Sequence, residues 1–116
     1  MELIVYTERY HVSRAVHNFM DFYYSMNMKY LASDLLGKGL SPEQITHAVE
    51  VALKVANSSG MEAHKHFMPV YSGLKQGVIK DCKLSHLAYS LVLINADANL
   101  KAVGKFQVDV LKRFLS

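Results

Sequence analysis

The sequence predicts an all-α fold, a compact single-domain bundle of five or six helices formed by residues 1–116. Two observations support this prediction. Apolar residues recur at spacings of three and four along most of the chain, which is the period of one face of an α-helix. Proline is nearly absent, and glycines concentrated in a few places divide the chain into segments of helix length. A hydrophobic content of 51% is enough for one core in a chain of 116 residues.

The first expected helix runs from Thr7 to about Tyr24. The segment that begins within it, "FMDFYYSMNMKYLA", contains more aromatic residues and methionines than one buried face requires. Clusters of this kind pack against other helices, or they form protein interfaces when they are exposed. We therefore expect either a core contact or a homodimer interface formed by Phe19, Phe22, Tyr23, Met26 and Tyr30.

A short second helix is expected from Met28 to Leu36, and the glycines of "GKG" at 37–39 end it. The start of the third helix has the clearest signal. In "SPEQ", Ser41 is at the N-cap, Pro42 is at the first helical position and Gln44 is at the capping-box position. "NSSG" at 57–60 is expected to end this helix. Its predicted buried stripe contains Ile45, Ala48, Val49, Ala52, Leu53 and Ala56.

The segment "MEAHKHFMPVY" is expected to form a short helix that Pro69 breaks, and "SGLKQG" to form a loop or turn. A further helix is expected to begin near Asp81, with Leu84, Leu87, Ala88, Leu91, Val92 and Asn95 on one side. A strand over "YSLVLIN" is the alternative, because short apolar runs do not distinguish the two structures. The last helix is expected from about Ala98 to Leu115, capped by Asp97 or Asn99. Its inward side contains Leu100, Val103, Phe106, Val110, Leu111 and Phe114.

The stretch "IKDCKLSHLAYSLVLINADANLKAVGKFQVDVL" resembles the core signature of the DNA-damage-inducible protein D group, which recurs in phage antirepressor-type proteins. That signature is a D-Y-x-L-S-R-x-A start, an apolar helix, an N-G-D stop and an alanine-rich helix with a glutamine. The residues that match it without a gap are Asp81, Leu84, Ser85, Ala88, Asn95, Asp97 and Gln107. Upstream, "HAVEVALKVANSSGMEAHKHF" is similar to another family segment through Ala52, Ala56, Ser59, Gly60, His66 and Phe67.

The resemblance covers about residues 31–111 and implies a bacterial or phage-derived protein of DNA-damage response or repressor control. It implies a regulatory interaction module, without enzymatic activity, that binds a repressor or a DNA-repair factor. Three family residues are replaced: tyrosine by Cys82, arginine by His86 and glycine by Ala96. Loss of the arginine removes a permanent cation that can bind a phosphate or carboxylate through two hydrogen bonds. The matched polar residues are otherwise expected to have architectural roles, as helix caps and turn formers: Asp81, Ser85, Asn95 and Asp97.

No catalytic, cofactor or metal site is expected. His64 and His66 are two residues apart, so on a helix they point in different directions, and no third ligand has a recognisable spacing. Cys82 and His86 are four apart and would touch on a helix. A thiol–imidazole pair also requires an oxyanion donor and an orienting group, and the sequence offers neither.

The alternative function is contact with the DNA phosphate backbone, because the formal charge is +3 and the pI is near 9.0. The lysines for this role lie before the signature helix and along the outer side of the last helix: Lys80, Lys83, Lys101, Lys105 and Lys112. They bind phosphate together only if the two groups converge; otherwise they keep the surface soluble. A helix-turn-helix over residues 28–58 has few side chains that read bases.

The expected location is the cytoplasm. No apolar run reaches the roughly 18–20 residues that span a bilayer. The N-terminal apolar patch precedes its charges, which is the reverse of a secretory signal. The single cysteine, Cys82, cannot form an internal disulfide, which agrees with a reducing compartment.

Overall fold

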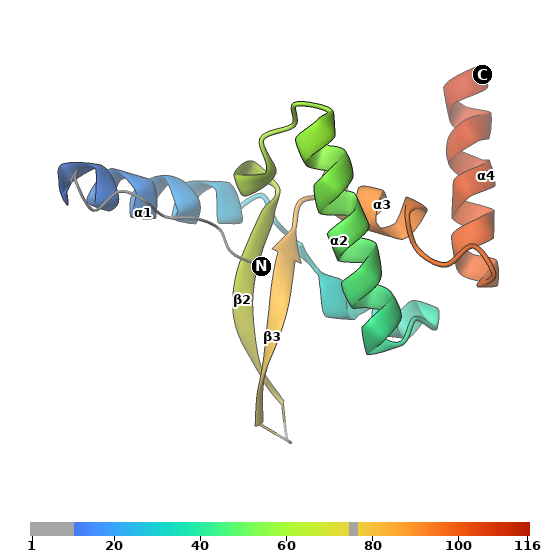
Figure 1. The fold of residues 1–116 in the computed structure, drawn as a ribbon, viewed down its shortest axis with the longest axis horizontal. Helices are drawn as coiled ribbons and strands as arrows, with labels where there is room; N and C mark the ends of the chain where they lie inside the picture. Colours follow the sequence, from blue (N-terminus) through green and yellow to red (C-terminus); the bar gives the residue numbers. More distant parts are fainter. Residues whose placement is uncertain (1–10, 75–76) are drawn as a thin grey trace.

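The structure is a computed structural model that describes residues 11–74 and 77–116 (Figure 1). These residues form a mixed α/β fold, which combines helices with a three-stranded antiparallel sheet of order β1-β3-β2. The strands are β1 (Tyr30–Leu31), β2 (Phe67–Leu74) and β3 (Gly77–Leu84), and β2 lies at one edge of the sheet. The predicted all-α fold is therefore wrong.

The hairpin of β2 and β3 occupies residues that the sequence assigns to a helix and a loop. The expected helix over 61–71 is present only as the 3-10 turn η2 (Ala63–Lys65), and β2 follows it. Proline cannot continue a helix but is tolerated in an edge strand, so Pro69 fits β2. Most of the expected loop over 72–77 continues the strands, and residues 75–76 lie outside the described residues.

The expected signature helix is divided between two elements. Its first residues belong to β3, and only α3 (His86–Ile94) is helical. Leu84, at the end of β3, and Ala88, in α3, are both fully buried. They are four residues apart, which is also the spacing of two residues on one side of a helix, so the sequence alone predicts a single helix. Leu87, predicted to face inward, is 55% exposed. The alternative strand over residues 89–95 is also wrong, because α3 contains most of them.

The helix predicted after Ser41 is confirmed as α2 (Pro42–Ser58), whereas the segment before α2 differs from its prediction. The helix expected from Met28 to Leu36 is β1 followed by the 3-10 helix η1 (Ala32–Lys38). Gly39, at a φ of 94°, ends η1, because glycine adopts this left-handed conformation without steric cost. The predicted capping box is present, with the Ser41 amide 2.8 Å from Gln44 Oε1 and the Gln44 amide 3.1 Å from Ser41 Oγ.

The core lies between α2, the sheet and α3. Small alanines on the inner side of α2 allow this helix to approach its neighbours closely, and α4 (Lys101–Leu115) adds one fully buried valine. The fully buried residues are Leu35, Ala48, Ala52, Ala56, Leu84, Ala88, Val92 and Val103, and Phe67 is 1% exposed. The core therefore depends on a sheet that the sequence reading does not predict.

Two helices extend from opposite sides of this body (Figure 1). The first, α1 (His11–Ser25), matches the expected first helix, whose residues 7–10 lie outside the described residues. The other, α4, is joined to α3 by a hydrogen bond from Gln107 Nε2 to the Ile94 carbonyl at 3.0 Å. Its N-cap position is Leu100 instead of an acidic or amide residue. Within the described ranges, none of the helices combines the length and apolar character needed to cross a bilayer.

Candidate functional site

An apolar stripe on α1 is the first candidate site. Its members recur at spacings of three and four, so they share one side of the helix. All five are more than half exposed: Val16, Phe19, Phe22, Tyr23 and Met26. Four of the five predicted interface residues therefore lie together on one exposed surface, which we call the α1 stripe.

The C-terminal end of α1 is attached to the body through aromatic contacts. The Tyr24 ring lies edge-on to His64, with 5.8 Å between the ring centroids, and Lys65 Nζ is 5.4 Å from the Tyr24 centroid. Met28, just after the helix, is buried. Because Tyr24 lies beside the α1 stripe and not within it, this attachment leaves the stripe exposed.

Tyr30, the fifth predicted interface residue, is separate from the α1 stripe. It belongs to β1, where its ring stacks on Tyr89 with 4.5 Å between centroids and lies 5.5 Å from His86. Burial raises the pKa of the Tyr89 phenol. Tyr30 therefore helps to hold β1 against α3 instead of extending the α1 stripe.

The structure places the five predicted lysines in two separate regions. Lys80 and Lys83 are on β3 and, being three residues apart on a strand, point to opposite faces of the sheet. Lys101, Lys105 and Lys112 are exposed on one side of α4, which Figure 1 shows at the other side of α2 from the hairpin. Lys105 forms an ion pair with Asp109 at 3.5 Å. The two groups do not form one basic face.

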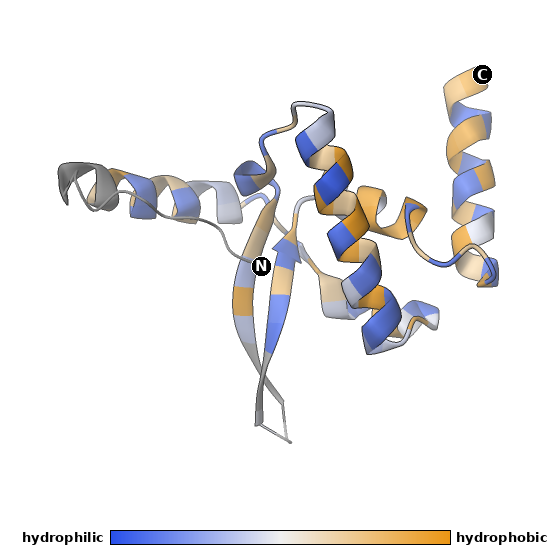
Figure 2. Cartoon of the chain, in the orientation of Figure 1, coloured by the Kyte–Doolittle hydropathy of each residue, from blue (hydrophilic) through white to orange (hydrophobic). Residues whose placement is uncertain are grey.

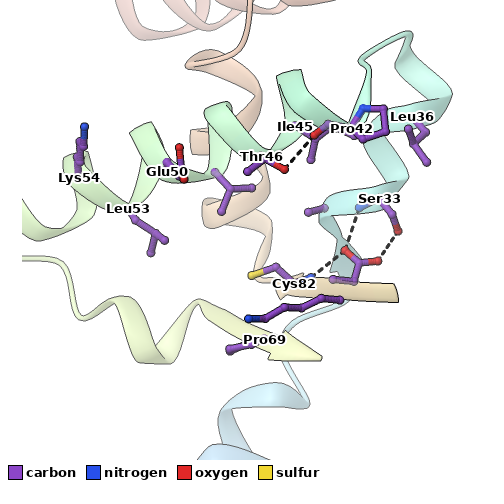
Figure 3. A pocket seen from close by; sticks show the side chains of 14 residues that line it. Ser33, Leu36, Pro42, Ile45, Thr46, Glu50, Leu53, Lys54, Pro69 and Cys82 are labelled. Atoms are coloured by element: carbon purple, nitrogen blue, oxygen red, sulfur yellow. Dashed lines mark hydrogen bonds between the residues drawn. The ribbon is translucent and has the colours of Figure 1, made fainter. Parts of the chain in front are cut away.

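An apolar groove of about 890 Å³ lies between α2 and the hairpin and is closed at one end by η1 (Figure 3). Its α2 wall contains Ile45, Val49 and Leu53, and its other wall contains Pro69 and Cys82. Charged side chains also line it: Glu50 and Lys54 from α2, and Lys80 and Asp81 from β3. We call this space the α2 groove.

Asp81 organises the closed end of the α2 groove. Its carboxylate accepts the Ser33 amide at 3.1 Å, the Ser33 hydroxyl and the Cys82 amide at 2.8 Å (Figure 3). These bonds connect η1 to β3. The expectation that Asp81 caps a helix of the signature is wrong, because Asp81 is a buried strand residue that bonds a distant turn.

The other matched polar residues mostly have the architectural roles expected of them. Ser85 is the N-cap of α3, where its hydroxyl accepts the Ala88 amide at 3.0 Å. Asn95, at the end of α3, donates to the Leu91 carbonyl at 2.8 Å, and Asp97 accepts the Asn99 amide at 2.9 Å. These contacts shape helix ends and turns.

The expected Cys82–His86 helical pair does not form, because Cys82 is in β3 and His86 begins α3. Burial raises the pKa of the Cys82 thiol to about 11, which opposes formation of a nucleophilic thiolate. Among residues 11–74 and 77–116, histidine, cysteine and acidic side chains form no group of three that is suited to hold a metal ion.

Two features of the site are not predictable from the sequence. The α2 groove requires the hairpin, which the sequence does not indicate. Leu111 and Phe114, near the end of α4, are expected to face inward, yet they are 58% and 82% exposed. The spacing of apolar residues along α4 predicts that the helix has an apolar side, but it does not show whether the rest of the chain covers that side.

Comparison of the chain with known protein families, curated proteins and solved structures gives no match.

Proposed function

We propose that this protein is a regulatory interaction module that acts by binding another protein through the α1 stripe. The observation that carries this proposal is the exposure of five large apolar side chains on one side of a helix that extends from the body. Scattered apolar residues are normal on a surface, but a continuous stripe of this kind marks an interaction site.

The size of the α1 stripe favours a groove on a partner protein. Five large side chains that are half exposed offer roughly 500 Å², which lies within the range of functional patches on monomers. An amphipathic helix with apolar residues at this spacing binds by placing its apolar side in a complementary groove. The resemblance to DNA-damage-inducible and antirepressor proteins supports a repressor or a DNA-repair factor as the partner, and a location in the cytoplasm.

The roles of the polar side chains support a function without catalysis. The His66 Nδ1 atom and the Ser85 Oγ atom are 2.7 Å apart, but that hydroxyl also accepts the Ala88 amide and is buried. Asp81 is fully engaged with Ser33 and Cys82. Groups that satisfy the backbone in this way serve the fold.

The experiment that tests the proposal places a photo-crosslinking residue at Phe22 in cells of the source organism, before and after DNA damage. We expect a crosslink to one protein, which then binds the purified wild-type chain and not a Phe19→Asp, Phe22→Asp variant. A crosslinking residue at Asp21, which is exposed on the opposite side of α1 from the stripe, is the matched control. Crosslinks only between copies of this chain would indicate a homodimer instead of a separate partner. No crosslink at Phe22 above the Asp21 control would refute the proposal.

Binding of the DNA phosphate backbone is the second candidate function. The observation that favours it is the row of three exposed lysines on one side of α4. A gel-shift series against salt concentration tests it. If α4 binds DNA, affinity falls steeply as salt increases, and Lys101→Gln with Lys105→Gln removes most of the shift. No shift at low salt excludes this candidate.

A further inference from the structure

We infer that two copies of this chain associate by exchanging their α4 helices, with the end of each α4 seated in the α2 groove of the other copy. This inference concerns self-association and does not require the proposed partner of the α1 stripe. It depends on two uncovered surfaces of the same chain that complement each other in shape, length and charge.

The first surface is the apolar side of α4 beyond its contact with the body. Val103 is buried, whereas the exposed fraction of the later residues Val108, Leu111, Phe114 and Leu115 is 50–82%. Figure 2 shows apolar residues continuing along α4 to the C-terminus. At spacings of three and four these residues share one side, which we call the α4 stripe.

The second surface is the α2 groove. A volume of about 890 Å³ holds several large side chains, and the walls are mainly apolar. The groove runs along α2 from Ile45 to Leu53, a helical rise of about 12 Å. The α4 stripe from Val108 to Leu115 has a rise of about 10 Å. The helix side and the groove therefore match in length.

One charged pair at the two surfaces also matches when α4 lies antiparallel to α2. On α2, Glu50 and Lys54 are one turn apart, exposed, and without an ion pair in the described chain. On α4, Lys112 lies beside the α4 stripe, one turn after Val108, whereas Asp109 lies on the far side of the helix and pairs with Lys105. Antiparallel packing places Lys112 near Glu50, so this pair has opposite charges.

The α4 helix does not reach the groove of its own chain. Figure 1 shows α4 on the other side of α2 from the hairpin, with its C-terminus pointing away from the body. A second copy is consequently the occupant that brings both surfaces together without a change of fold. If each chain contributes its helix to the other, the contact is reciprocal and closes as a two-fold dimer.

The area of a reciprocal exchange is sufficient for a stable dimer. The four residues of the α4 stripe offer roughly 400 Å², and the groove that receives them offers a smaller area. Each copy supplies one helix and one groove, so at most about 650 Å² per copy is buried, which lies at the lower end of standard specific interfaces. Pairing of two α1 stripes alone buries less.

The first test measures the mass of the purified chain by sedimentation across a range of concentrations. We expect a dimer for the wild type and a dissociation constant raised by about 100-fold or more in Leu111→Glu with Phe114→Glu. Two matched controls are expected to remain dimers: Lys101→Glu, away from the α4 stripe, and Phe19→Asp with Phe22→Asp. A monomeric wild type, or a dimer that the α4 substitutions leave intact, would overturn the inference.

The second test identifies the surfaces in contact. Two single variants, Thr46→Cys on the groove and Phe114→Cys on α4, are mixed and oxidised, and peptide mapping identifies the disulfides. We expect the Thr46–Phe114 bridge between chains in preference to the His47–Phe114 bridge from a His47→Cys control, because His47 does not line the groove. Equal bridging from both positions contradicts the groove contact. The variant with Phe19→Asp and Phe22→Asp separates this inference from the proposed function. It is expected to lose binding of the partner protein and to remain a dimer.

Discussion

The hydroxyl of Ser85 and the imidazole of His66 are 2.7 Å apart, which joins the N-terminus of α3 to the residue just before β2. The Ser85 amide also donates to the His66 carbonyl at 2.9 Å. This pair holds the first turn of α3 against the sheet at the boundary that the sequence reading places inside a helix. Ser85 thereby contributes to both local capping and tertiary structure.

Replacing Ser85 with alanine is expected to lower the free energy of unfolding by about 1–2 kcal/mol, because the Ala88 amide loses its cap and His66 loses its partner. Urea denaturation measures this change. Ser85→Thr, which retains a hydroxyl, is expected to recover most of the stability. Equal stabilities of the alanine variant and the wild type would show that the pair contributes nothing.

Asp81→Ala is expected to destabilise the fold by about 3 kcal/mol, because it leaves the Ser33 and Cys82 amides without a buried acceptor. Thermal and urea denaturation both measure the loss. Asp109→Ala removes an exposed carboxylate and is the matched control, expected within about 0.5 kcal/mol of the wild type. A similar small effect at Asp81 would contradict the role assigned to its hydrogen bonds.

The Cys82 thiol is expected to react slowly in the folded protein at pH 8. With a pKa raised by burial to about 11, its thiolate fraction is about 100-fold below that of an ordinary thiol. A disulfide reagent should therefore label Cys82 rapidly only in urea. The folded state binds the proton more tightly, so the free energy of unfolding falls as pH rises from about 9 towards 11. Rapid labelling of the native chain would show that the thiol is accessible.

Leu84→Ala and Leu87→Ala are expected to differ strongly, although the sequence places both residues on one inward side. Leu84 is fully buried at the end of β3, so its truncation should cost about 3 kcal/mol. Leu87 is largely exposed on α3, and its truncation should cost less than about 1 kcal/mol. Chemical denaturation of the two variants compares them directly, and equal losses would favour a single continuous helix.

Local signals predict the start of α2 and the end of η1. Ser41 and Gln44 form the expected capping box because both partners lie within one turn, and Gly39 ends η1 for a purely local steric reason. The hairpin is not predictable in this way. Its two strands stabilise each other by pairing, and Phe67 in β2 lies opposite Leu84 in β3. The spacing of apolar residues within one segment does not indicate which other segment it pairs with.

The candidate site is predictable only where it depends on local composition. The density of aromatic residues and methionines predicts an interface by composition alone, and four of the five predicted residues lie together on the α1 stripe. Tyr30 does not, because β1 redirects the chain after α1 and stacks Tyr30 on Tyr89. The two lysine groups are separated by the insertion of α2 between the hairpin and α4, an arrangement that only the tertiary structure reveals.

Pro69 lies within β2, at the edge of the sheet. An edge strand presents free backbone groups that can recruit further strands from other molecules and begin fibrous aggregation. Because proline has no amide hydrogen, another strand cannot form an unbroken ladder along β2. The same residue that ends the helical pattern in the sequence thus protects the folded chain from uncontrolled strand-by-strand growth at this edge.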